Sequence, residues 1–192
     1  MVGDAHVKGT LLVHLRAHVS ERDGEEAWKR LVLRLPPFDR ATLGSLIVSG
    51  AWYPVGTWNR ALREQLTAHP TDPAAEMTEI ARRVADADLH TVFKMLLKLA
   101  SAETILRRTS WLWERYFDRG GMTVHEDAPS DWRLRLDAPI GEDDGANEST
   151  CAHGVAGWLT HALHLVGAKR AVVTHTRCRF AYARGCEYRV VW

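Results

Sequence analysis

All three cysteines of this 192-residue chain fall in its last forty-two residues, from Cys151 to Trp192. Cys178 and Cys186 are separated by seven residues, and the apolar runs on either side alternate, which predicts two antiparallel strands. A turn centred on Tyr182 places the two cysteines opposite each other, with Cβ atoms roughly 5 Å apart. Cys151 starts an apolar-periodic helix, where free backbone amides and the helix dipole favour a thiolate. The sequence therefore predicts three sulfurs at the junction of a helix and a hairpin.

Three readings of these cysteines are open: a cross-strand disulfide, buried inert thiols, or a shared metal ion. A closed tetrahedral zinc site needs a fourth ligand, and His175, three residues before Cys178, is the nearest candidate. A regular strand places positions 175 and 178 on opposite faces, so this site requires a bulge or bend between them. The predicted metal ligands are Cys151, His175, Cys178 and Cys186.

The C-terminal segment resembles the corresponding half of a 4-vinyl-reductase-type domain. The resemblance rests on Cys151-Ala-His-Gly154-Val-Ala-Gly157, on His175-Thr-Arg-Cys178 and on Cys186-Glu-Tyr188. That family is grouped with haem-nitric-oxide-binding domains and Bet3-like trafficking subunits as small ligand-binding folds.

The resemblance implies structural zinc, because sensors of this family that control aromatic-degradation regulators hold zinc through three cysteines and an acidic residue. His175 stands where those sensors have the carboxylate, and Tyr182-Ala183 replaces their usual Gly-Asp turn. The whole chain also resembles an uncharacterised bacterial family, recognisable by Ser49-Gly-Ala-Trp-Tyr-Pro54 and Trp113-Glu-Arg-Tyr-Phe117.

Composition excludes some partners. The chain has 25 basic and 24 acidic residues and a net charge of +1, so no global field draws it to nucleic acid or to an anionic membrane. No signal peptide opens the sequence, and no apolar run approaches the roughly 20 residues that cross a bilayer. We expect a cytoplasmic protein, in which three cysteines favour thiols or metal over disulfides.

The fold class predicted is α+β, a single domain over residues 1–192. Residues 1–118 are expected to form a helical layer, with helices at 7–20, 24–35, 39–47, 57–66, 74–99 and 101–117 and a packed loop at 49–56. Residues 119–192 are expected to form the zinc-site part: an antiparallel sheet of about four strands, covered by a helix over 154–166. The acidic stretch 141–149 reads as a loop or linker.

Aromatic residues surround most of the 101–117 helix, so it either fills the core or lines a ligand cavity. If a cavity opens there, its predicted lining is Trp111, Trp113, Tyr116 and Trp132. Trp52 and Tyr53 either line a pocket or pack into the core of the helical layer. His90 reads as a solvent-facing residue of the long helix, and the YxSxR triad of haem-nitric-oxide domains has no match, so no haem is expected.

The sequence therefore predicts a regulatory or sensory domain that binds a small apolar ligand and carries structural zinc. The alternative is a dimerising interaction adaptor of the same fold, and a reductase-like enzyme ranks third because no cofactor motif or catalytic residue is evident. A homodimer is expected, and a protein partner is possible under the adaptor reading.

Overall fold

The computed structural model describes residues 5–91, 100–137, 148–181 and 183–192. Its N-terminal part is helical, comprising α1 (Gly9–Asp23), α2 (Glu25–Arg34), α3 (Pro37–Leu43), α4 (Val55–Ala68) and α5 (Pro73–His90). Two shorter helices follow, α7 (Ala102–Arg107) and α8 (Thr109–Tyr116). None of the described helices is long and apolar enough to cross a lipid bilayer.

Local chemistry sets several of these boundaries. Asp72 accepts a hydrogen bond from the amide of Ala75 and caps α5, and Pro73 occupies the first helical position, where no amide is needed. Ser101 caps α7 in the same way through the amide of Thr104. Asp39, where the predicted helix was expected to begin, lies inside α3, fully buried, and accepts hydrogen bonds from Thr57 and Arg60.

The C-terminal part is built on a four-stranded antiparallel sheet of order β3-β4-β6-β5. Its strands are β3 (Gly121–Ala128), β4 (Asp131–Asp137), β5 (Val172–Arg177) and β6 (Cys186–Val191). A π-helical turn, η2 (Thr150–Val155), leads directly into α9 (Ala156–Leu165), and a 3₁₀ turn, η3 (Arg179–Ala181), follows β5. The predicted α+β class, with a helical layer and about four antiparallel strands, is confirmed.

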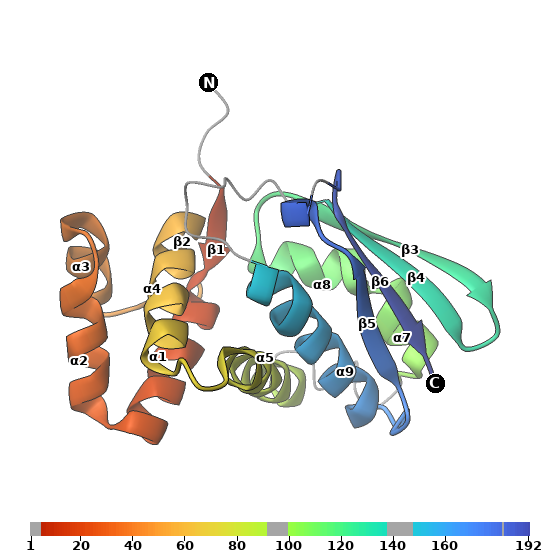
Figure 1. Ribbon diagram of the computed structural model, residues 1–192, viewed down its shortest axis with the longest axis horizontal. Coiled ribbons are helices and arrows are strands. Elements are labelled where there is room, and N and C mark those ends of the chain that lie inside the picture. Colours follow the sequence, from red (N-terminus) through yellow and green to blue (C-terminus); the bar gives the residue numbers. More distant parts are fainter. Residues whose placement is uncertain (1–4, 92–99, 138–147, 182) are drawn as a thin grey trace.

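One face of this sheet belongs to the core. Along β4 the side chains of Trp132, Leu134 and Leu136 are buried, whereas Arg133 and Arg135 between them are exposed. The register pairs Leu134 with Tyr188 and Leu136 with Cys186, so the buried face continues across β6. Figure 1 shows α9 running beside the sheet, while α2 and α3 lie at the opposite end of the molecule.

Several boundaries differ from the predictions. Residues 6–8 form β1 (His6–Lys8), not helix, and pair with β2 (Trp52–Pro54) inside the predicted loop. The predicted 101–117 helix breaks at Arg108. The predicted long helix runs through His90, and its remainder at 92–99 lies outside the described residues, as does most of the 141–149 loop.

The α9 segment packs most closely against α5 and also contacts β5 of the sheet, which it was predicted to cover. A Cβ on Gly157 would lie 3.3 Å from Cγ2 of Thr78, and a Cβ on Gly154 would lie 2.9 Å from Cε of Met77. Both neighbours belong to α5. These two glycines therefore bring the C-terminal helical segment against the N-terminal part, and this contact borders the cavity described below.

Candidate functional site

The three cysteines come together at one end of the sheet. Cys151 lies in η2, Cys178 directly follows β5, and Cys186 begins β6. All three are buried and none is in a disulfide. Their sulfur atoms lie within 4.8 Å of one another. The strand register shifts between His175 and Arg177, so the irregularity that the predicted site requires is present in β5.

Hydrogen bonding divides the protons unequally among these sulfurs. The contact with Cys151, followed by the amide of Arg179 and the side chain of His175, lowers the pKa of Cys186 to about 5. The same contact, with burial, raises the pKa of Cys151 far above its usual range. Burial likewise raises the pKa of Cys178. Within the cluster the proton is therefore held more tightly at Cys151 than at Cys186.

His175 is half-buried and stacks on Tyr188, with ring centroids 5.0 Å apart. Its Nε2 is buried without a hydrogen-bond partner among the described residues. Glu148, which sequence reasoning missed, lies with His175 and Cys178 in a second group whose ligand atoms are within 4.8 Å of one another. That Cys151, His175, Cys178 and Cys186 bind a metal ion stays a prediction.

A cavity of about 120 Å³ lies between the helical part and the sheet. It is lined by α1, α4, α5, α8, η2 and α9, together with Met122 of β3 and Leu136 of β4. No charged side chain among the described residues belongs to its lining. The lining is mainly aromatic and aliphatic: Trp58, Trp113, Tyr116, Phe117, Trp158, Ile80, Ala81, Val84, Leu112 and Leu159.

Of the four predicted ligand-binding residues, Trp113 and Tyr116 line this cavity, whereas Trp111 and Trp132 do not. Trp132 is only 1% exposed and packs beside Trp192, with Arg107 over its ring. Trp111 is half-buried under the guanidinium of Arg115. The lining residues that were missed include Trp58, Asn59 and Trp158. That a bound ligand contacts Trp111, Trp113, Tyr116 and Trp132 stays a prediction.

Trp52 and Tyr53 do not belong to the cavity lining either. Trp52 is 42% exposed with Lys8 above its ring, and the hydroxyl of Tyr53 accepts a hydrogen bond from the amide of Val48. Cys151 belongs to both features, because it lines the cavity and also contributes a sulfur to the cysteine cluster.

No protein-family model and no curated protein sequence matches the chain. Several solved structures match its fold. An H-NOX protein from S. oneidensis in the Fe(II)NO ligation state is 13% identical and matches with a TM-score of 0.73 over 95% of this chain and 97% of that one. An unliganded Fe(II) H-NOX mutant from K. algicida is 8% identical, with a TM-score of 0.72 over 96% and 95% of the two chains. The IWP-051-bound H-NOX from Shewanella woodyi is 9% identical, with a TM-score of 0.69 over 95% and 93%.

These matches correct two expectations. The assignment to the 4-vinyl-reductase-type domains is wrong, because the matched structures are H-NOX (haem NO/oxygen-binding) proteins. The expectation of structural zinc without haem is contradicted as well, because the matched proteins are described by Fe(II), NO and CO ligation and by porphyrin distortion. At 8–13% identity the likeness concerns the backbone only. The chain has the fold of the H-NOX proteins.

Proposed function

We propose that this protein is a sensory domain, not an enzyme, and that it binds a small, mostly apolar molecule in the cavity between its helical part and its sheet. The single observation that carries the proposal is the cavity itself. Well-packed interiors contain few voids larger than a water molecule, so an apolar void of about 120 Å³ needs an explanation. An engineered apolar cavity of about 150 Å³ stays dry and binds benzene.

The position of the cavity suits a sensor. Its lining draws side chains from α4 and α5 and also from α8, α9 and the sheet, so a bound molecule contacts both parts of the chain. A ligand that contacts both parts stabilises the arrangement to which it binds most tightly, by its differential affinity. This coupling needs no catalytic group.

The matched H-NOX proteins contain haem, and a haem site needs a ligand for the iron and cations for the propionates. The described lining contains no histidine, lysine or arginine, which leaves no imidazole for iron and no cation for the propionates. Cys151 lines the cavity, but its hydrogen bond with Cys186 and its burial raise the pKa of its thiol, and burial followed by the charge of Asp88 raises the pKa of Tyr116 well above its usual range. A volume of about 120 Å³ takes a single small ring, not a porphyrin. These residues are therefore not complementary to haem.

Benzene tests the proposal. It should raise the melting temperature of the wild-type protein in proportion to RT ln(1 + [L]/Kd), and it should change the tryptophan fluorescence, because Trp58, Trp113 and Trp158 line the cavity. The variant Ala81→Leu fills the cavity from α5 and should lose both responses. Ala41→Leu, at an exposed position of α3, is the matched control and should keep them. Binding of hemin with an iron spectrum, but no response to benzene, would contradict the proposal.

The second candidate is the dimerising adaptor. The observation in its favour is that several large hydrophobic side chains are exposed in and around α2 and α3: Leu33, Phe38, Leu46 and Val48. An open apolar cavity does not suit an adaptor, whose core has no reason to remain incompletely packed. A benzene-insensitive protein that forms a stable dimer would favour this alternative.

A further inference from the structure

The surface that faces the cavity is almost wholly apolar, although several lining residues carry polar atoms. The hydroxyl of Thr109 donates to the carbonyl of Leu106, and the indole nitrogen of Trp113 donates to the carbonyl of Arg119. Backbone acceptors therefore already satisfy these two donors, which offer nothing to a ligand.

Tyr116 and Asn59 do not turn polar atoms toward the cavity either. The hydroxyl of Tyr116 is hydrogen-bonded to Asp88 and to the indole of Trp158. The side-chain amide of Asn59 has no hydrogen-bond partner among the described residues, but it does not open onto the cavity surface. A polar group on a ligand therefore finds no partner in the described lining, and burying such a group without a hydrogen bond is costly.

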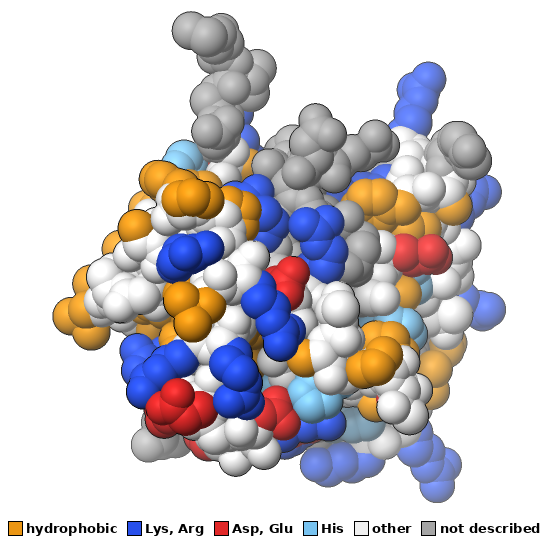
Figure 2. All heavy atoms as spheres, turned by 60° about the vertical axis from the view of Figure 1, so that its left-hand side comes forward, with side chains coloured by type: hydrophobic (Ala, Val, Ile, Leu, Met, Phe, Trp, Pro, Cys, Tyr) orange, Lys and Arg blue, Asp and Glu red, His pale blue; other side chains and the backbone are white. Residues whose placement is uncertain are grey.

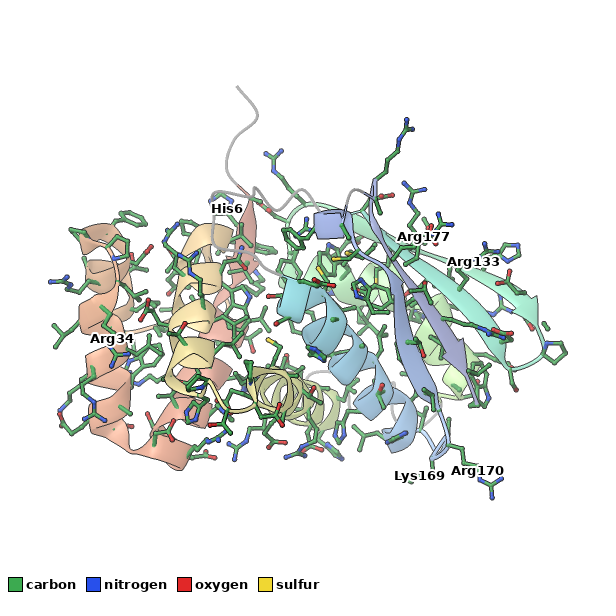
Figure 3. All side chains as sticks on the ribbon, in the orientation of Figure 1. His6, Arg34, Arg133, Lys169, Arg170 and Arg177 are labelled. Carbon is green, nitrogen blue, oxygen red and sulfur yellow. The ribbon has the colours of Figure 1, made fainter. Side chains whose placement is uncertain are left out.

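Charged ligands are excluded on the same ground. No charged side chain among the described residues lines the cavity, so a carboxylate or ammonium group entering it would lose its hydration without gaining a counter-ion. The basic side chains of Lys169 and Arg170 project away from the molecule at the turn between α9 and β5 (Figure 3). The ligand that fits is therefore a hydrocarbon or a similarly apolar molecule.

The lining also distinguishes between kinds of hydrocarbon, because aromatic rings form a large part of it. Trp113 and Phe117 are stacked, with ring centroids 4.1 Å apart and an angle of 18° between the planes. Tyr116 and Trp158 meet edge to face, with centroids 6.1 Å apart. Trp58 adds a fifth ring from α4. Aromatic pairs in stacked or edge-to-face geometry gain free energy beyond the area that they bury, so a flat aromatic ring gains more here than a saturated one.

Two methionines add to this preference. Met77 of α5 and Met122 of β3 both line the cavity. A thioether sulfur makes favourable contacts with the edge of an aromatic ring, and the flexible side chain adjusts to the shape of its neighbour. A saturated ring gains only the packing part of these contacts.

We propose that the cavity selects a monocyclic aromatic hydrocarbon of the size of benzene or toluene, packed against the aromatic side chains of α8 and α9. This assignment rests on the proposed ligand-binding function and adds to it the chemical class of the ligand. Phenols are rejected because their hydroxyl would be buried without a partner. The volume of about 120 Å³ limits the ligand to one ring with at most a small substituent.

Three probes of nearly the same shape test the assignment: toluene, phenol and methylcyclohexane. In titrations of the wild-type protein followed by NMR, toluene should bind at least about tenfold more tightly than phenol, because the hydroxyl of phenol leaves water without gaining a new hydrogen bond. A phenol affinity equal to that of toluene would mean that a polar partner can be reached from the cavity.

Methylcyclohexane leaves water more readily than toluene, so these two affinities are compared through variants. Phe117→Leu replaces one lining ring by an aliphatic side chain, and the ratio of toluene to methylcyclohexane affinity should fall by about threefold relative to wild type. The difference in hydration between the two probes cancels, because it is the same for both proteins. Continued binding of methylcyclohexane shows that the variant keeps its cavity.

Two further variants complete the comparison. Trp158→Leu should lower the same ratio from the side of α9, and it serves if Phe117→Leu does not fold. Ile80→Leu is the matched control, because it exchanges one aliphatic lining side chain for another, and it should leave the ratio unchanged.

The outcomes separate the two claims. If toluene binds but phenol binds equally well, the aromatic-hydrocarbon assignment is overturned and the ligand-binding function survives. The same holds if the ratio of toluene to methylcyclohexane affinity in the aromatic variants equals that of wild type. If none of the three probes binds, the proposed function fails, and the assignment fails with it.

Discussion

His18 is a buried imidazole that the fold keeps neutral. It is 2% exposed, its Nε2 lies 2.8 Å from Oε1 of Glu76, and its Nδ1 has no hydrogen-bond partner among the described residues. Burial, followed by the charges of Arg83 and Arg22, lowers its pKa from 6.5 to about 4. A lone unpaired Nδ1 suits the neutral ring, since a second N–H there would be a buried donor without an acceptor.

Acid should therefore destabilise the protein through His18. Between pH 6.5 and 4 the unfolded chain binds this proton and the folded chain does not, so the free energy of unfolding falls as the pH falls, by up to about 1.4 kcal/mol per pH unit. Urea unfolding at several pH values should show this slope reduced in His18→Gln. The control His90→Gln, at an exposed position, should keep it. Equal slopes in wild type and His18→Gln would contradict the explanation.

Trp132 is a core residue outside the cavity lining. It is 1% exposed and pairs with Val190 across the strands. Trp132→Ala should lower the free energy of unfolding by about 3–5 kcal/mol, the usual cost of removing a packed aromatic side chain. Trp111→Ala, at a half-buried position, should cost clearly less in the same urea titration. A loss below about 2 kcal/mol at Trp132 would show that this part of the sheet is loosely packed.

At the scale of elements, α1 directly follows β1, and its first residue, Gly9, contacts the turn that precedes β2. The amide of Gly9 donates to the carbonyl of Ala51, and a Cβ on Gly9 would lie 2.2 Å from the carbonyl oxygen of Val48. Because that contact is with backbone, it cannot be relieved by a side-chain rotation.

Gly9→Ala should therefore destabilise the protein by about 1–3 kcal/mol, the usual cost of overpacking. Gly50→Ala is the matched control: it lies in the same turn region, but nothing is within 4 Å of its added Cβ. The control should change the midpoint of thermal unfolding little. Equal effects of the two substitutions would mean that the turn adjusts freely around α1.

The elements that the sequence predicted best have strong local signals. The β3–β4 hairpin alternates along its length, and the α2 helix ends just before Leu35 and a Pro-Pro pair. Strands β1 and β2 were missed, because three residues are too few to show alternation and their pairing joins segments more than forty positions apart. The break at Arg108 was missed for a similar reason, since the apolar spacing continues through it.

The candidate site was also predicted only in part: the cysteine cluster had a local signal in the sequence, and the cavity did not. The cysteines could be brought together from the sequence because hairpin spacing is local, and the register pairs Arg177 with Glu187, the neighbours of Cys178 and Cys186. The cavity depends on how α4, α5, α8 and α9 pack, which no local pattern encodes. Asn59 did leave a signal: it is a polar residue next to Trp58 on the face of α4 that also carries Val55 and Leu62.

For the whole molecule, the exposed hydrophobic side chains of the helical part favour self-association. Figure 2 shows the helical side, where hydrophobic side chains lie among basic ones. Leu46 is 82% exposed and Phe38 is 64% exposed. We expect a two-fold dimer through this side, and Leu46→Lys should shift it toward monomer in analytical ultracentrifugation. Val172→Lys, on β5, is the control. A monomeric mass at high micromolar concentration would contradict the expectation.

The most direct test of the ligand-binding account is a crystal structure of the protein under xenon pressure, because xenon enters dry apolar cavities of this size. The account predicts one strong xenon peak between α5, α8 and α9, in contact with Ala81, Trp113 and Leu159, and no such peak in Ala81→Leu. Side chains that fill this volume in the wild-type crystal, with xenon absent from it, would contradict the account.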